Sequence, residues 1–118
     1  SYYEPWGYTP MESIAFGVPT ITTTLSGFGQ WILGNFDNKF AVCGVNVIDR
    51  NDNNYHNVVD TIVYDIMQLA KTGDAFRNNI STMASHTSHH ASWKNFIVYY
   101  EEAYELALQR SATRKHIE

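Results

Sequence analysis

Cysteine is nearly absent from this sequence, with one in 118 residues, and no apolar run approaches the roughly 20 residues that span a bilayer. A lone cysteine excludes an internal disulfide and fits a reducing compartment, so we expect a cytoplasmic protein without a membrane span. Cys43 lies within an apolar stretch, residues 40–47, which predicts a buried core side chain rather than a nucleophile.

Basic residues are also scarce. The formal net charge at pH 7 is −4, and neither Lys nor Arg occurs between Ser1 and Asn38. A nucleic-acid interface needs a basic stripe, so we expect no nucleic-acid partner. A pyrophosphate site usually combines cations with N–H donors, so any such site in this segment would take its cations from elsewhere in the protein.

The composition, 44% hydrophobic and 17% charged, is typical of one globular domain or of part of a larger one. Apolar periodicity and helix breakers predict short strands and helices followed by three longer helices. Strands are expected over residues 18–22 and 40–48, and helices over residues 10–16, 27–33, 55–71, 74–86 and 92–109. Asp74 is the expected N-cap of its helix, and a frayed or disordered tail is expected over residues 111–118.

The beginning of the sequence predicts a loop that turns into a helix. Pro5, Gly7 and Pro10 exclude a regular helix or strand ladder between them. Proline is tolerated at the first helical position, so we expect the helix to begin at Pro10. Thr9 and Glu12 then have the spacing of a capping box, with Thr9 as the N-cap.

This junction between loop and helix has a chemical consequence. The helix start presents free N–H groups over residues 8–12 and the positive end of the helix dipole, which together form a ready site for a phosphate. Glu4 and Glu12 flank it, and carboxylates accept hydrogen bonds from hydroxyls, so the pair suits a ligand that carries phosphate and sugar. The alternative is that Glu12 only caps its helix and Glu4 is a solvated loop residue. A second turn, residues 26–29, is expected beside this loop.

Glu4 and Glu12 are separated by seven residues within YYEPWGYTPMES, which is followed by GVPTITT and LSGFG. These motifs closely resemble the C-terminal domain of glycogen synthases of the animal and fungal type and of their bacterial relatives. The strong resemblance covers residues 1–31. VNVIDR at residues 45–50 and the tryptophan-led last helix are similar in kind.

The resemblance implies a fold of the α/β class. The chain would be the C-terminal part of a Rossmann-like domain in a GT-B glycosyltransferase, with parallel strands followed by helices. No strand–helix unit precedes the first loop, so we expect residues 1–110 to form the second half of that domain. We expect the intact protein to be a retaining glycosyltransferase and this fragment alone to be inactive.

The resemblance implies transfer of glucose from a sugar nucleotide to the non-reducing end of an α-1,4-glucan, with retention at the anomeric carbon. UDP-glucose is the favoured donor, ADP-glucose is the other candidate, and a homo-oligomer stays open. No metal and no separate cofactor are expected, because the helix end and cations from the rest of the protein share the donor's charge. The alternatives are a glucan-binding or assembly module without catalysis, and a retaining transferase of this architecture with another acceptor.

The resemblance also implies roles for individual residues. Glu4 is the expected catalytic residue, which contacts the donor glucose hydroxyls and stabilises an oxocarbenium-like transition state. The backbone of Gly7, Tyr8 and Thr9 is expected to hold the distal phosphate of the sugar nucleotide. Glu12 is expected to hydrogen-bond the ribose hydroxyls, and the LSGFG turn to line the sugar pocket.

Three histidines, His86, His89 and His90, have a helical spacing that a zinc ion could use. No cysteine or paired carboxylate is near, so a solvated helix end is the favoured interpretation. The sequence also lacks a dense arginine-rich helix, such as the one through which eukaryotic members of the resembled family sense sugar phosphate. We therefore expect no such regulation.

Two further features have structural interpretations. Tyr99, Tyr100 and Tyr104 could stack on a sugar polymer, but their spacing favours a stripe that faces the core. The resemblance implies a second alternative, in which the last helix crosses back to the other domain and Trp93 and Tyr100 pack there. Asp49 and Arg50 could be an acid and a base near an active site. A solvated strand end without a partner is the favoured interpretation of this pair.

Overall fold

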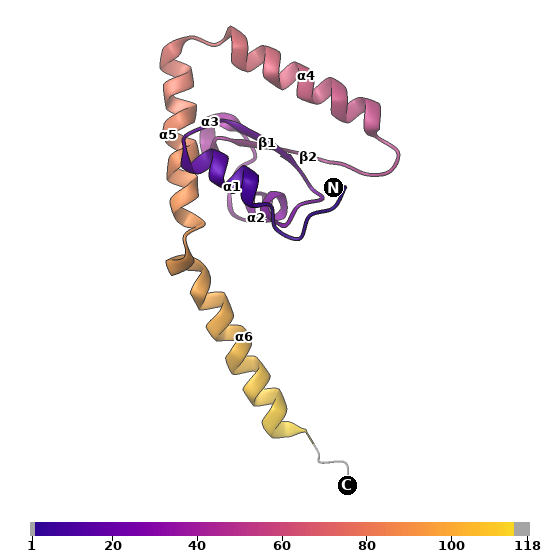
Figure 1. The fold of residues 1–118 in the computed structure, drawn as a ribbon, viewed down its shortest axis with the longest axis vertical. Helices are drawn as coiled ribbons and strands as arrows, with labels where there is room; N and C mark the ends of the chain where they lie inside the picture. The colour runs from indigo at the N-terminus through magenta and orange to yellow at the C-terminus, as the bar shows by residue number, and fades with distance from the viewer. Residues whose placement is uncertain (1, 115–118) are drawn as a thin grey trace.

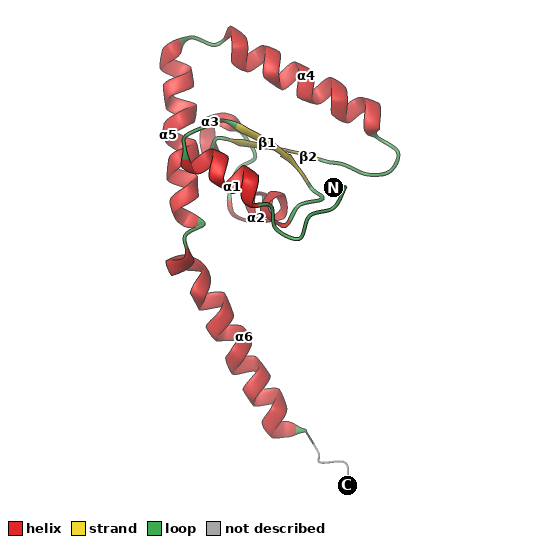
Figure 2. Ribbon diagram, in the orientation of Figure 1, coloured by secondary structure: helices red, strands yellow, loops and turns green. Residues whose placement is uncertain are grey.

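The structure is a computed structural model, and it describes residues 2–114 (Figure 1). Figure 2 shows the short strands side by side and the long helices that follow them in the chain. The elements are α1 (Tyr8–Ala15), β1 (Thr20–Thr23), α2 (Gly27–Asn35), α3 (Phe40–Cys43), β2 (Val45–Ile48), α4 (Tyr55–Lys71), α5 (Asp74–His90) and α6 (Trp93–Thr113).

β1 and β2 form a parallel sheet of two strands. Thr20 pairs with Val45 and Thr23 pairs with Ile48, so both strands end at the same edge of the sheet. The Thr24 N–H extends the pairing by donating to the Ile48 carbonyl at 3.0 Å. The predicted α/β class, with parallel strands followed by helices, is confirmed for the described residues.

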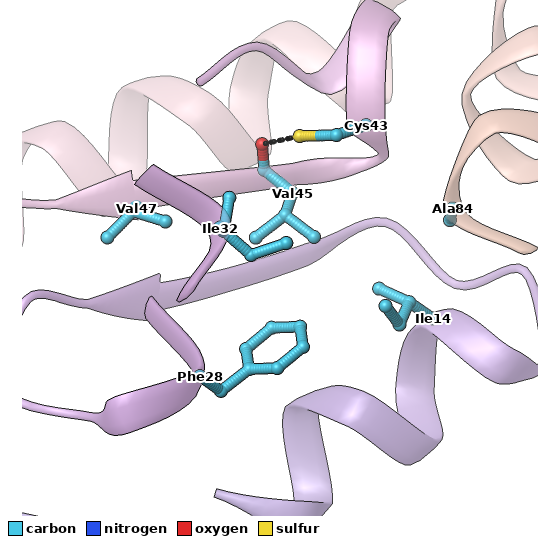
Figure 3. Packing of buried hydrophobic residues seen from close by; sticks show 7 residues of the cluster. All are labelled: Ile14, Phe28, Ile32, Cys43, Val45, Val47 and Ala84. Carbon is cyan, nitrogen blue, oxygen red and sulfur yellow. Dashed lines mark hydrogen bonds between the residues drawn. The ribbon is translucent and has the colours of Figure 1, made fainter. Parts of the chain in front are cut away.

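The core lies between the sheet, α1, α2 and α5 (Figure 3). Ile14 of α1 and Phe28 and Ile32 of α2 are fully buried, and each such side chain contributes about 1.5–3 kcal/mol by leaving water. Cys43 is fully buried too, and its thiol donates to the Val45 carbonyl at 3.3 Å. Burial raises the pKa of this thiol, so the interpretation of Cys43 as a core residue is confirmed.

The predicted strand over residues 40–48 is wrong in its first half. Residues 40–43 form α3, a single helical turn, and β2 begins only after Gly44, whose φ is +72°. A Cβ on Gly44 would lie 2.3 Å from the Ala84 Cβ, because α5 passes directly over this position. Both the left-handed backbone and the close helix contact therefore require glycine here. A continuous apolar run does not distinguish a helical turn from a strand.

The long helices follow the predicted pattern, with some of their ends shifted. α4 has the predicted bounds, and α5 continues to His90 rather than ending near residue 86. The N-cap of α5 is Gly73 and not Asp74. Among the described residues, no helix is long and apolar enough to cross a membrane.

The C-terminal helices extend well beyond the core (Figure 1). α5 packs against α1 and α3, whereas α6 leaves the core after Ala91 and buries none of its residues. α6 continues to Thr113, into the stretch expected as a tail, and residues 115–118 lie outside the described part. The radius of gyration is 18.3 Å, against about 13–14 Å for a compact domain of this length.

Candidate functional site

Two loops lie side by side at the start of α1. The Glu4 N–H donates to the Leu25 carbonyl (3.1 Å), and the Gly27 N–H donates to the Glu4 carbonyl (3.2 Å). These two bonds form a parallel bridge between Glu4 and Ser26. A further bond follows it, in which the Phe28 N–H donates to the Trp6 carbonyl at 2.8 Å. The prediction that the first loop and the second turn are neighbours is confirmed.

The close approach of these loops requires glycine at position 27, where a Cβ would lie 2.0 Å from the Pro5 carbonyl oxygen. The preceding residue, Ser26, is the N-cap of α2. Its hydroxyl accepts a hydrogen bond from the Gly29 N–H at 3.0 Å and lies 3.1 Å from the Thr22 hydroxyl. Ser26 is expected only as part of a turn, although serine before a helix start is a strong N-cap signal.

Trp6 anchors the first loop from its other side. Its ring packs edge-on against Phe28, with centroids 5.8 Å apart, and against Phe96, at 5.4 Å. A third aromatic ring, Trp31, lies 6.1 Å away. Such pairs contribute about 0.5–1.5 kcal/mol each beyond burial. This cluster therefore holds the loop that contains Glu4 against α2 and α6.

The tyrosines of α6 do not face a core. Tyr99, Tyr100 and Tyr104 are 59%, 48% and 66% exposed, so the predicted core-facing stripe is wrong for the described residues. Within residues 2–114, α6 packs against the rest of the chain near its start, where Phe96 meets Trp6 and Trp31, and it extends away from the core beyond that point. Tyr99 and Tyr100 instead line a groove of about 510 Å³ that also contains Trp6 and Tyr8.

α1 begins at Tyr8, two residues earlier than predicted. Gly7 is its N-cap, with a φ of +108°, and no side chain caps this helix. Thr9 is therefore inside the first turn, and the predicted capping box of Thr9 and Glu12 is wrong. The reason is the left-handed backbone of Gly7, which glycine adopts readily and which starts the helix before Thr9.

Among the described residues, the first turn of α1 presents unpaired backbone donors, two of them on the exposed residues Tyr8 and Thr9 and one on Gly7, which is buried. Pro10 occupies the third helical position and has no N–H, so the donors at this end are the N–H groups of Gly7, Tyr8 and Thr9. Within residues 2–114, none of these three groups donates to another residue. The helix dipole adds about half a positive charge here, so this end of α1 is suited to an anion.

Glu4 lies at the same end of α1. A Cβ built on Gly7 would be 3.2 Å from Glu4 Oε2, so the carboxylate lies over the N-cap. The Glu4 side chain is exposed, and no other described side chain hydrogen-bonds to it. Glu12 is also exposed and follows Tyr8 by one helical turn, about 6 Å along the axis. Glu4 thus lies at the unpaired donors, and Glu12 lies one turn further along the helix.

Arg50 lies at the end of β2 and has two aromatic partners. Its guanidinium carbon is 5.3 Å from the Tyr2 ring centroid and 5.1 Å from the Tyr55 ring centroid. The Tyr2 hydroxyl donates to Asp52 at 2.7 Å, and this hydrogen bond raises the pKa of the Tyr2 phenol. The interpretation of Arg50 as a solvated strand end without a partner is therefore wrong.

The three histidines are exposed in the last turns of α5, in agreement with the solvated interpretation. The Nε2 atoms of His86 and His90 lie 3.4 Å apart, and the Phe36 ring packs against His90 with centroids 5.6 Å apart. Among residues 2–114 there is no group of three or more His, Cys, Asp or Glu side chains that could hold a metal ion.

Comparison with known protein families assigns the whole sequence. A family model described as glycogen synthase matches residues 1–118. The chain belongs to the glycogen synthase family. This finding confirms the resemblance that EPWGYTP and LSGFG carry.

Individual glycogen synthases match over most of this chain. It is 34% identical over 111 residues to the glycogen [starch] synthase of Neurospora crassa, an alignment that covers 94% of this chain and 16% of that protein. It is 35% identical over 111 residues to glycogen [starch] synthase isoform 2 of Saccharomyces cerevisiae, and the alignment covers 93% of this chain and 16% of that protein. It is 31% identical over 122 residues to the human liver protein, with 100% and 17% covered. The chain thus spans about a sixth of the length of these relatives.

In this member of the glycogen synthase family, the first loop and α1 contain acidic but no basic side chains. Glu4 and Glu12 flank the open end of α1, and the first 38 residues contain no Lys or Arg. Arg50 is a basic residue in contact with Tyr2 of this loop, and its guanidinium lies over the rings of Tyr2 and Tyr55. What the start of α1 offers to an anion is therefore backbone donors and a helix dipole.

Proposed function

We propose that this chain is the donor-binding part of a glycogen synthase, which transfers glucose from a sugar nucleotide to the non-reducing end of an α-1,4-glucan with retention. The observation that carries the proposal is the position of Glu4. Its carboxylate lies over the N-cap of α1, beside three open backbone donors. Membership of the glycogen synthase family supports the same activity.

In this proposal the distal phosphate of the donor binds at the start of α1. The N–H groups of Gly7, Tyr8 and Thr9 are held by the loop and helix before the reaction begins, so they stabilise charge on the leaving nucleotide without rearrangement. The helix end supplies about half a positive charge, which is less than a pyrophosphate needs. The remaining cations come from outside this chain, and no metal or separate cofactor takes part.

Glu4 contacts the hydroxyls of the donor glucose and stabilises positive charge at the anomeric carbon in an oxocarbenium-like transition state. A carboxylate suits both tasks, because it accepts hydrogen bonds and attracts positive charge. Its place over Gly7 supports this role, because the proposed site of the glucose-bearing phosphate begins at the same residue.

Glu12 hydrogen-bonds the ribose hydroxyls. Its side chain is exposed and caps no helix, so its carboxylate is available to a ligand. Retaining glycosidases place a second carboxylate close to the first, on the other side of the scissile bond. Because Glu12 already serves the ribose, we assign it to donor binding and not to covalent catalysis.

The sheet supports this location of the proposed site. Ligands of open α/β sheets bind beyond the carboxyl ends of the strands, and the turn that holds Glu4 directly follows β1. We therefore assign β1 and β2 to the C-terminal part of a Rossmann-like domain of the GT-B type. UDP-glucose is the proposed donor, and the proposed location is the cytoplasm.

A glucan-binding module without catalysis is the second candidate. The observation in its favour is the groove lined by Trp6, Tyr99 and Tyr100, because exposed aromatic rings can stack on the apolar faces of sugars. The flanking carboxylates and open donors at α1 favour the transferase, since binding a neutral glucan needs no anion site.

The test is glucosyl transfer to glycogen by the intact protein, from UDP-glucose and from ADP-glucose. We expect transfer from UDP-glucose with retention, its loss in Glu4→Ala, and normal transfer in Glu102→Ala, an exposed carboxylate on α6. All three proteins should melt at the same temperature. A folded protein that transfers glucose from neither donor contradicts the proposal, and glycogen binding by that protein would favour the second candidate.

A further inference from the structure

The first loop is tied to the end of β2 by a small cluster that we call the Arg50 clamp, which consists of Tyr2, Arg50, Asp52 and Tyr55. The guanidinium lies 5.3 Å from the Tyr2 ring centroid and 5.1 Å from that of Tyr55. The Tyr2 hydroxyl donates to Asp52 at 2.7 Å. Tyr2 is thus held at its ring and at its hydroxyl by residues about 50 positions away in the sequence.

The clamp is fixed to the sheet through Thr24. The Arg50 N–H donates to the Thr24 hydroxyl at 3.0 Å, and the Thr24 N–H donates to the Ile48 carbonyl at 3.0 Å. The Gln30 side-chain amide donates to the Thr24 carbonyl at 2.7 Å. Thr24 therefore joins the ends of both strands to α2, and Arg50 reaches Tyr2 from a rigid base.

Glu4 depends on its main chain for its position. Within residues 2–114 no side chain hydrogen-bonds to its carboxylate, and its main chain bonds to Leu25 and Gly27 of the second turn. Pro5 stiffens the chain that follows. Tyr2 precedes Glu4 by two residues, so a clamp on Tyr2 limits how far the loop can swing from the second turn.

We propose that Arg50 is a positioning residue for Glu4, acting through Tyr2, an inference that rests on the proposed function for its effect on catalysis. The guanidinium lies over two tyrosine rings, and two carboxylates, Asp49 and Asp52, are its neighbours in sequence. These surroundings favour a role in holding the loop over a role in binding the donor phosphate. Arg50 holds the loop and does not touch the donor.

The test compares Arg50→Ala and Arg50→Lys with Arg77→Ala in the intact protein. Arg77 is a matched control, because it is also an arginine and its guanidinium bonds to backbone carbonyls at the end of α4, Ala70 and Thr72. Two readouts are needed: amide hydrogen exchange of the segment that contains Glu4, and steady-state kinetics of glucosyl transfer.

In Arg50→Ala we expect faster exchange at the Glu4 amide and a kcat lowered about five- to thirtyfold, which is the effect of losing two cation–π contacts. The donor KM should stay unchanged, and the melting temperature should fall by only a few degrees, because the lost contacts are local. Arg50→Lys should lie in between, because an ammonium keeps the attraction to the rings but loses the planar stacking. Arg77→Ala should match the wild type. Adding Tyr2→Ala to Arg50→Ala should cost little more, because both act through one contact.

Unchanged exchange and kcat in Arg50→Ala, in an active wild-type protein, would overturn the inference and leave the proposed function intact. Full additivity of Tyr2→Ala and Arg50→Ala would overturn it as well. So would a higher KM and a large fall in melting temperature beside the lower kcat, because these indicate a general loss of structure. If the wild type transfers no glucose but Glu4 exchange still rises in Arg50→Ala, the proposed function fails and the clamp is supported.

Discussion

Gly27→Ala disturbs the contact between the two loops of the site most directly. A Cβ at this position would lie 2.0 Å from the Pro5 carbonyl oxygen, whereas an ordinary contact begins near 3.4 Å. The carbonyl must therefore retreat by about 1.4 Å. The hydrogen bond from the Gly27 N–H to the Glu4 carbonyl, 3.2 Å long, cannot persist after such a shift.

The magnitude of the effect follows from these contacts. Loss of the hydrogen bond costs about 0.5–1.5 kcal/mol, and the overpacked Cβ costs about 1–3 kcal/mol. We therefore expect the free energy of unfolding to fall by about 2–4 kcal/mol. Glucosyl transfer should fall further, on the order of 100-fold in kcat, because a displacement of about 1 Å at Glu4 spoils the reacting geometry.

Thermal unfolding and transfer kinetics of the intact protein measure both effects, with Gly34→Ala as the matched control. Gly34 lies in the same helix, α2, and a Cβ there meets nothing within 4 Å. Because alanine favours helix, this control should gain about 0.5–1 kcal/mol in stability and keep its kcat. Wild-type stability and activity in Gly27→Ala would refute the argument that the contact of the loops positions Glu4.

Three further predictions concern the core, the ribose site and the clamp. Gly44→Ala places a Cβ 2.3 Å from the Ala84 Cβ at a φ of +72°, so thermal unfolding should show a loss of about 2–5 kcal/mol, and an unchanged melt would contradict this packing. Glu12→Gln removes no helix cap, so calorimetry should show weaker UDP binding at a constant melting temperature, whereas the reverse result would restore the cap-only interpretation. The hydrogen bond to Asp52 raises the folded-state pKa of Tyr2, so its contribution to stability is present below the unfolded value of 10.0 and is lost as the pH rises through the folded-state value. Tyr2→Phe should remove this part of the alkaline stability profile, and identical profiles would count against the bond.

The sequence predicted most where local rules decide the structure. The bounds of α4 follow from an amphipathic repeat that ends before Gly73, and they are correct. The strand at residues 40–48 fails because an apolar run carries no period, and the close contact of Gly44 with α5 is a tertiary constraint. The prediction of a core-facing stripe on α6 failed for a similar reason, since periodicity identifies an apolar face but not what covers it.

The site shows the same division. The motifs placed Glu4, Gly7 and Tyr8 at one end of a helix, although the positive φ of Gly7 replaced the expected Thr9 cap. The partners of Arg50 were not predictable, because Tyr2 reaches it across about 50 residues of chain. Contacts of this kind depend on how the chain folds around the sheet and not on local spacing.

The backbone at the start of α1 is the proposed binding site of the donor phosphate. Tyr8→Pro removes one of its N–H groups at the first helical position, where proline is tolerated. Tyr8→Ala removes the same side chain and keeps the N–H, so it is the matched control. The decisive measurement is the affinity of the intact variants for UDP by titration calorimetry. We expect Tyr8→Pro to bind UDP about 10- to 100-fold more weakly than Tyr8→Ala, the effect of one hydrogen bond to a charged group. Equal affinities in two equally stable variants would contradict the account.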